Sequence, residues 1–101
     1  MITDPMPLTI ENAQSVKKNF LRLLEEKGSL SVHMNDITEI DLAGIQILVA
    51  LVLEGASKDR EIHFTGTIFP EVQSRLRLAG FNEEFCATGE KFELAIKAAC
   101  Q

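Results

Sequence analysis

The sequence predicts an α/β fold in which a small, mainly parallel sheet of four strands, or five if the N-terminus adds one, packs with about four helices. Three observations predict it. Segments with strand-like alternation and segments with helical periodicity follow one another along the chain. The two clearest strand segments, residues 29–34 and 60–66, flank a long apolar connection, which normally holds a right-handed crossover helix between parallel strands. A chain of 101 residues can bury one core, so we expect a single domain over residues 1–101.

The N-terminal part predicts a short strand followed by a helix. The strand is MPLTI, residues 6–10, and the helix lies in ENAQSVKKNFLRLLEEKG. Apolar residues recur there at helical spacing and share one face; they are Ala13, Val16, Phe20, Leu23 and Leu24. We expect Asn12 to cap the N-terminus of this helix and Gly28 to end it in the left-handed conformation.

Two half-buried strands are predicted from strict alternation of apolar and polar residues. They are SLSVHM, residues 29–34, and REIHFTG, residues 60–66. His33 and His63 fall on the polar sides of these strands. Because no third ligand of a suitable type accompanies them, we expect two ordinary strand residues and no metal site.

The C-terminal part predicts two further helices. The first runs through PEVQSRLRLAG, with Pro70 in its first turn and Gly80 as its stop. A short extended segment is expected around Phe85. The last helix is predicted to begin after a capping Thr88 and to place four apolar residues in register, namely Phe92, Ala95, Ile96 and Ala99.

The longest apolar run lies in EIDLAGIQILVALVLEGA, residues 39–56. Its uninterrupted part is shorter than the about 20 residues of a membrane span, so we expect a crossover helix and no membrane insertion. The predicted inner stripe consists of Ile45, Leu48, Val49, Val52 and Ala56, flanked by Leu42 and Leu53. The opposite side carries Ala43, Ile47, Ala50, Leu51 and Glu54. Since that side is mostly apolar, it either packs under another helix of the domain or offers a docking patch to a partner protein.

The start of this helix is marked by Asp41 and Gly44. A carboxylate at the N-cap accepts hydrogen bonds from free amides of the first turn and lies at the positive end of the helix dipole. Glycine is a poor helix former, so Gly44 indicates close backbone approach to a neighbour or a ligand. We expect the carboxylates of Asp36, Glu39 and Asp41 to serve capping and solvation rather than catalysis, because no nucleophile, histidine or phosphate-binding glycine loop accompanies them.

Charge and cysteine content exclude several classes of function. Fifteen acidic residues against ten basic ones give a formal net charge of −5, which disfavours nucleic acid and anionic membranes as partners. The N-terminus shows no signal-peptide pattern, so a cytoplasmic location is the default expectation. Cys86 and Cys100 lack metal-ligand or redox spacing and are expected to be free thiols. We expect no enzyme activity, cofactor or metal.

The segment LSVHMNDITEIDLAGIQILVALVLEGASKDREIHFTG resembles the central part of STAS domains. In that family a strand ending in a pattern like D-L-S-x-V-x-x-I-D leads into a helix that starts D-S/T-x-G. The corresponding residues here are Asn35, Asp36, Ile37, Ile40, Asp41 and Gly44. The ending RLRLAGF is similar to the usual L-x-x-x-G-L/F close, so the resemblance covers about residues 7 to 99 and implies a STAS-like fold. Family members often begin with two strands, whereas only MPLTI is evident here.

The chain departs from this family at the position that partner kinases phosphorylate. The Ser or Thr that follows the motif Asp is replaced by Leu42, and neither Leu42 nor Ala43 has a hydroxyl group. The resemblance implies a non-enzymatic interaction module like the bacterial anti-sigma factor antagonists (anti-anti-sigma factors), acting in signal transduction and transcription regulation without phosphorylation at residue 42.

The resemblance also implies the class of partner: an anti-sigma serine kinase, a chemosensory component or a transporter subunit. The expected contact residues are Asp36, Thr38, Ala43, Ile47, Ala50, Leu51 and Glu54. On this basis Ile47→Asp is expected to abolish partner binding and leave the fold intact. The alternatives are an accessory subunit of a lipid transport or chemosensory system, and a domain that binds a small ligand or lipid near Gly44, Arg75 and Arg77.

Overall fold

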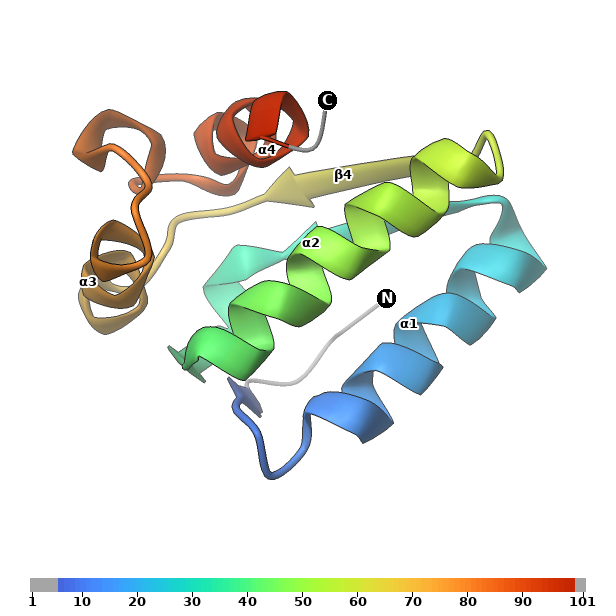
Figure 1. The fold of residues 1–101 in the computed structure, drawn as a ribbon, viewed down its shortest axis with the longest axis horizontal. Helices are drawn as coiled ribbons and strands as arrows, with labels where there is room; N and C mark the ends of the chain where they lie inside the picture. Colours follow the sequence, from blue (N-terminus) through green and yellow to red (C-terminus); the bar gives the residue numbers. More distant parts are fainter. Residues whose placement is uncertain (1–5, 100–101) are drawn as a thin grey trace.

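The computed structural model describes residues 6–99 and confirms the α/β class. The elements in chain order are β1 (Met6–Leu8), α1 (Ala13–Lys27), β2 (Ser29–His33), the 3-10 helix η1 (Met34–Asp36), β3 (Ile37–Ile40), α2 (Leu42–Ser57), β4 (Glu61–Thr65), α3 (Pro70–Leu78), the 3-10 helix η2 (Glu83–Phe85) and α4 (Gly89–Ala99). Helices α1 and α2 lie side by side and run in the same direction, whereas β4 runs back against them (Figure 1). The strands and α-helices follow the predicted order, except that β3 is added between β2 and α2.

The strands pair differently from the prediction. Within residues 6–99 they form two separate parallel pairs, β1 with β3 and β2 with β4, and not one four-stranded sheet. Leu8 lies opposite Ile40 in the first pair, and Leu30 lies opposite Ile62 in the second. The short η1 separates β2 from β3, so β3 pairs with the N-terminal strand instead of extending the β2–β4 sheet. The structure does not describe residues 1–5, so a fifth strand before β1 is not tested.

Two local predictions are wrong. The segment around Phe85 is the 3-10 helix η2 and not an extended strand. Strand β3 is absent from the predicted elements, because the polar Thr38 and Glu39 stand together between Ile37 and Ile40 and break the alternation of a half-buried strand.

The helix ends follow the predicted capping chemistry, with one difference. Gly28 has a φ of 74° and donates its amide to Leu24 O at 2.9 Å, as a left-handed stop does. Thr88 Oγ1 accepts a hydrogen bond from the amide of Lys91 at 3.3 Å, and Pro70 begins α3. Asn12 occupies the N-cap of α1, but its side-chain oxygen accepts from the amide of Thr9 at 2.9 Å and so braces the preceding turn instead of the helix.

The aromatic core holds α4 against β4. The rings of Phe64 and Phe92 meet edge to face with centroids 5.4 Å apart, and Phe81 packs against Phe92 at 5.2 Å. Both Phe64 and Phe92 are fully buried. Edge-to-face contact of this kind adds specific geometry to the hydrophobic burial, so these rings help to fix α4 against β4.

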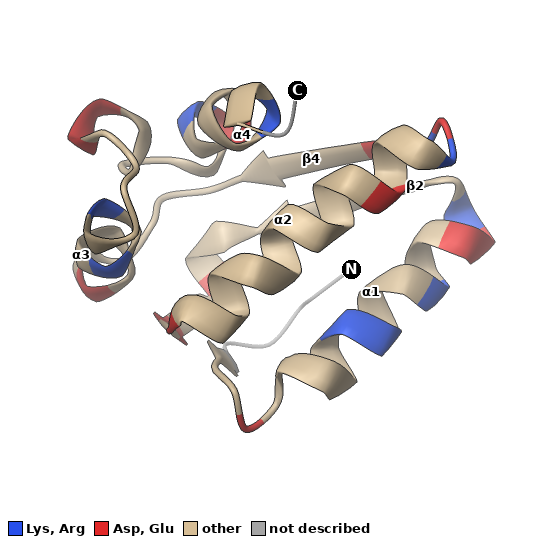
Figure 2. Ribbon diagram, viewed as in Figure 1, with Lys and Arg blue, Asp and Glu red and all other residues tan. Residues whose placement is uncertain are grey.

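Helix α2 buries Ile45, Leu48 and Val52 of the predicted inner stripe, but Val49 is half-buried, Ala56 is exposed, and the buried surface extends over Ile47 and Leu51 on the other side. Its buried centre line carries Gly44, Leu48, Leu51 and Gly55, while Leu42 and Leu53 are exposed. The two glycines lie where the backbone approaches the strands most closely: a Cβ on Gly44 would overlap Leu8 O, and one on Gly55 would lie 3.0 Å from the Ile62 side chain. Because both sides of α2 are apolar, periodicity alone could not determine which side faces the strands. Figure 2 shows how little charge α2 carries.

Candidate functional site

Asp41 joins the start of α2 to the loop that follows β1. Its Oδ1 accepts a hydrogen bond from the amide of Gly44 at 3.0 Å, as predicted for an N-cap. Its Oδ2 accepts a second hydrogen bond from the amide of Ile10 at 2.9 Å. These amides stabilise the ionised carboxylate and hold the pKa of Asp41 below its usual value, the contribution of Gly44 being the largest and that of Ile10 the next. Both oxygens of the cap are therefore used within the fold.

Gly44 allows α2 to press directly against β1. A side chain at this position would overlap the Leu8 carbonyl and lie against the side chain of Ile40. The amide of Asp41 also donates to Leu8 O at 3.3 Å. The predicted close approach at Gly44 is confirmed, and the neighbour is the chain's own strand. Since Gly44 is buried there, it offers no surface to a ligand.

Leu42, the first residue of α2, is exposed beside another exposed leucine. It is 64% exposed, and Leu78 at the end of α3 is 79% exposed. The two residues help to line a hollow of about 230 Å³ together with Asp41, Ile45, Arg75 and Ala79. We call these six residues the Leu42 patch. Ile10, whose amide binds Asp41, adds a third large exposed apolar side chain near the helix start.

The predicted docking residues along α2 lie on a side that α1 covers. Glu54 and Glu25 of α1 both bind Lys58, at 3.0 Å and 2.7 Å, which shows that this side of α2 faces α1. On it, Ile47 is only 7% exposed and Leu51 is fully buried, while Ala43, Ala50 and Glu54 are half-buried. The expectation that these residues form an outward docking face is wrong, and the alternative of packing under a second helix is correct.

The expected effect of Ile47→Asp changes with this placement. A carboxylate at a buried apolar position has no partner and must be desolvated, so the substitution is expected to disturb the fold itself. The variant therefore cannot separate partner binding from stability.

The remaining predicted contact residues lie apart from the Leu42 patch. Asp36 is half-buried at the end of η1. Thr38 is exposed on β3 and lines a different hollow with Phe69, Pro70 and Glu71, at the opposite end of α3 from Leu78. Sequence reasoning missed Leu78 and Ile10. The signal for Leu78 is an apolar residue off the face that Val72 and Leu76 bury, but nothing in the sequence shows that it lies beside Leu42.

A family model for the STAS domain matches residues 1–99. The chain belongs to the STAS domain family. No curated protein and no solved structure gives a match to it. This match confirms the resemblance to STAS domains that the sequence indicates.

The two histidines of this STAS domain enter separate hydrogen-bond groups. His33 Nδ1 lies 3.0 Å from Thr65 Oγ1, whereas His63 lies 3.4 Å from Glu93 and 3.5 Å from Glu61. Among residues 6–99 no group of three or more His, Cys, Asp or Glu side chains is placed to hold a metal ion. In the same part of the chain we find no helix with the length and hydropathy that a membrane span requires.

Cys86 of the STAS domain is a buried free thiol. Its Sγ lies 3.3 Å from Asn82 O, and burial raises the pKa of the thiol. A buried thiol with a raised pKa is a poor nucleophile. Cys100 lies outside the described residues.

Proposed function

We propose that this STAS domain is a non-enzymatic interaction module that binds a partner protein through the Leu42 patch. The observation that carries the proposal is the pair of exposed leucines, Leu42 and Leu78, on two different helices at the capped start of α2. Neither side chain contributes to the core, and adjacent exposed apolar side chains rimmed by charge are typical of protein contact surfaces. Here the rim is supplied by Asp41 and Arg75.

The partner is regulated without phosphorylation of residue 42. In the family pattern a phosphate at this position would add a charge of about −2 at the start of the helix. Leu42 offers a large apolar contact instead, and it cannot alternate between two charge states. Binding through the Leu42 patch is therefore constitutive with respect to that switch, and any regulation comes from another input.

The proposed partners are those that the family resemblance implies. They are an anti-sigma serine kinase, a chemosensory component or a transporter subunit, in the cytoplasm. The first would make the protein an anti-sigma factor antagonist acting on transcription, and the last an accessory subunit of a lipid transport system. For each, the contact surface should be apolar and should carry an acidic group opposite Arg75.

A matched pair of substitutions on α2 tests the docking surface. Leu42→Asp and Leu53→Asp both place a carboxylate at an exposed leucine, but only the first lies in the Leu42 patch. Tagged variants are isolated from the native cells and the bound candidate partner is quantified. We expect recovery to fall at least about tenfold for Leu42→Asp and to stay unchanged for Leu53→Asp, since burying a charge in an apolar contact is strongly unfavourable. Undiminished recovery with Leu42→Asp would sink the proposal.

A kinase assay tests the absence of the switch. The protein is incubated with an anti-sigma serine kinase and ATP and then examined by mass spectrometry. We expect no phosphate on residues 41–44 of the natural sequence, whereas Leu42→Ser introduces a hydroxyl at that position and serves as the positive control. Phosphate on any of these four positions of the unaltered chain would contradict the proposal.

A further inference from the structure

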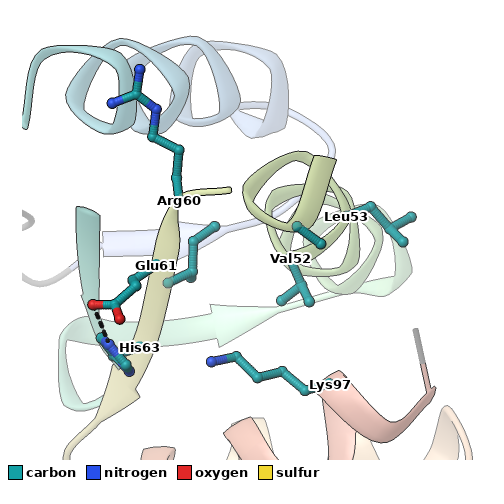
Figure 3. A pocket seen from close by; sticks show the side chains of 8 residues that line it. Val52, Leu53, Arg60, Glu61, His63 and Lys97 are labelled. Carbon is teal, nitrogen blue, oxygen red and sulfur yellow. Dashed lines mark ion pairs between the residues drawn. The ribbon is translucent and has the colours of Figure 1, made fainter. Parts of the chain in front are cut away.

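A second hollow lies toward the other end of α2 and is independent of the Leu42 patch. It has a volume of about 310 Å³, within the range of small-molecule sites. The last turns of α2, the start of β4 and the C-terminal part of α4 form it (Figure 3). Its lining residues are Val52, Leu53, Ala56, Arg60, Glu61, Ile62, His63 and Lys97. At about 1.5 Å per residue, Leu53 lies about 16 Å along the helix axis from Leu42.

The floor of this hollow is aliphatic. Val52 and Ile62 belong to the buried core, while Ala56 and Leu53 are exposed next to them. The four side chains carry no hydrogen-bonding group, so a ligand that covers them must present hydrocarbon. A hollow of this volume holds about ten groups of the size of a water molecule, at about 30 Å³ each.

Lys97 supplies a positive charge at the rim. Its side chain extends from α4 across the hollow toward β4 (Figure 3), and its Nζ lies 3.2 Å from Glu93 Oε2. Glu93 is itself held in place, because its Oε1 accepts the amide of Phe64 at 2.7 Å. An ammonium group has three N–H donors, so Lys97 can bind Glu93 and still donate to a ligand. Glu93 thus fixes the position of the lysine without using all of its hydrogen bonds.

Among the charged side chains that line the hollow, only Lys97 is placed to favour an anion. Arg60 turns its guanidinium away from the hollow and toward α1 (Figure 3). One of its nitrogens lies close to Gly28, at the end of α1. Glu61 lies at the rim beside His63, at 3.5 Å, and its side chain is largely exposed, so it can turn into solvent. The anionic head of a ligand is therefore expected beside Lys97, at the edge away from Glu61.

We propose that this hollow binds a small amphiphilic anion, an aliphatic carboxylate of medium chain length. Its hydrocarbon chain covers Val52, Leu53, Ala56 and Ile62, and its carboxylate pairs with Lys97. Octanoate, with about ten non-hydrogen atoms, matches the volume of the hollow. For a ligand of this size the affinity should lie in the micromolar to millimolar range.

A titration of the full chain with octanoate, followed by two-dimensional NMR, tests the proposal. We expect saturable shifts of the amide signals of Leu53, Ile62 and Lys97 that fit a single site. Octan-1-ol has the same chain without the charge, and we expect it to bind at least about fivefold more weakly, because a charge-assisted hydrogen bond is lost. Shifts that do not saturate, that map elsewhere, or that are equally strong with octan-1-ol would overturn the proposal.

Two matched pairs of variants locate the site. Lys97→Met keeps the aliphatic stem and removes the charge, and we expect it to weaken octanoate binding at least about fivefold. Lys91→Met, on an exposed position of the same helix outside the hollow, should bind as the natural chain does. Ala56→Leu fills part of the hollow and should reduce binding, whereas Ser57→Leu, one residue further, should not. Unchanged binding by Lys97→Met or by Ala56→Leu, with the fold intact by NMR, would contradict the assignment.

Discussion

Asp41 accepts, through Oδ2, a hydrogen bond from the amide of Ile10, which lies 31 residues earlier in the chain, at 2.9 Å. The same carboxylate caps α2 through Gly44. One side chain thus sets both the beginning of the helix and its position against the β1 loop. Asp41 therefore holds the start of α2, and with it the exposed Leu42, in place against the β1 loop.

We expect Asp41→Asn to lower the melting temperature by several degrees, because an amide replaces one of the two acceptor oxygens with a donor. The loss should depend on pH. The folded state lowers the pKa of Asp41 through the amides of Gly44 and Ile10, so its stabilising effect is fully present above the ordinary aspartate pKa of about 3.9 and disappears as pH falls through the folded value.

The measurement is thermal unfolding of both proteins at a series of pH values from about 6 to about 2. Glu25 and Glu93 also have lowered pKa values, but they are present in both proteins, so the difference between the two melting curves reports on Asp41. A difference that stays constant down to the lowest pH would show that the carboxylate charge has no part in the cap.

Gly44→Ala should destabilise the protein, although alanine is the better helix former by about 1 kcal/mol. The added methyl group would overlap the Leu8 carbonyl, and backbone cannot move aside as a flexible side chain can. We expect a net loss of about 1–3 kcal/mol in the free energy of unfolding, as for other overpacked sites. Gln46→Ala, on the exposed side of the same helix, is the control and should be neutral or slightly stabilising. Chemical denaturation of both variants checks this, and a stabilised Gly44→Ala would refute the close approach.

The orientation of α2 is tested by comparing Leu51→Ala with Leu53→Ala. Leu51 is fully buried and Leu53 is half exposed, so the same truncation should cost about 2–5 kcal/mol at residue 51 and under about 1 kcal/mol at residue 53. Denaturant titration gives both values. Equal costs, or a larger cost at residue 53, would mean that α2 does not turn the side that carries Leu51 toward the core.

Glu93→Gln tests the link between α4 and β4. Burial alone would raise the pKa of Glu93, but hydrogen bonds from the amide of Phe64, from Lys97 and from His63 together lower it. The ionised form is therefore the one that stabilises the fold above the ordinary glutamate pKa of about 4.3, and that contribution is lost as pH falls through the folded value.

We expect Glu93→Gln to reduce the free energy of unfolding at neutral pH by about 1 kcal/mol. Glu90→Gln, exposed on the same helix, should change it little. The amide of Phe64 should also exchange faster with solvent in Glu93→Gln, because its hydrogen bond to Oε1 is weakened. Protection of that amide equal to that in the natural chain would argue against the link.

The sequence predicted the elements whose boundaries carry local chemistry. Gly28, Pro70 and Thr88 each specify a helix end through their own backbone or hydroxyl group, and all three lie where expected. Strand β3 was missed because Thr38 and Glu39 point outward together, and a strand without alternation has no signature in a single sequence.

For the candidate site, the sequence predicts the residues that cap and position α2 but does not predict its exposed apolar surface. The residue types of Asp41 and Gly44 alone suggest what these two residues contact. Asp41 accepts a hydrogen bond from an amide of the first helical turn, and Gly44 lies against the backbone of a neighbouring strand. The apolar side of α2 that carries Ile47 was compatible with packing under another helix or with docking to a partner, and only the position of α1 decides between them. Leu78 lines the same hollow as Leu42 but comes from α3, which begins well after α2 in the chain, and no pattern in either segment shows that the two residues lie at one site.

Both strand pairs are parallel, and this determines how the chain can fold. Residue 8 must find residue 40, and residue 30 must find residue 62, each across a complete helix. Neither pair can begin as a hairpin, so each requires closure of a long loop before any ladder hydrogen bond forms. Folding should therefore be slower than for a helical bundle of equal length. Helix formation in α1 and α2 needs no such loop closure, so we expect it to precede the pairing of β1 with β3.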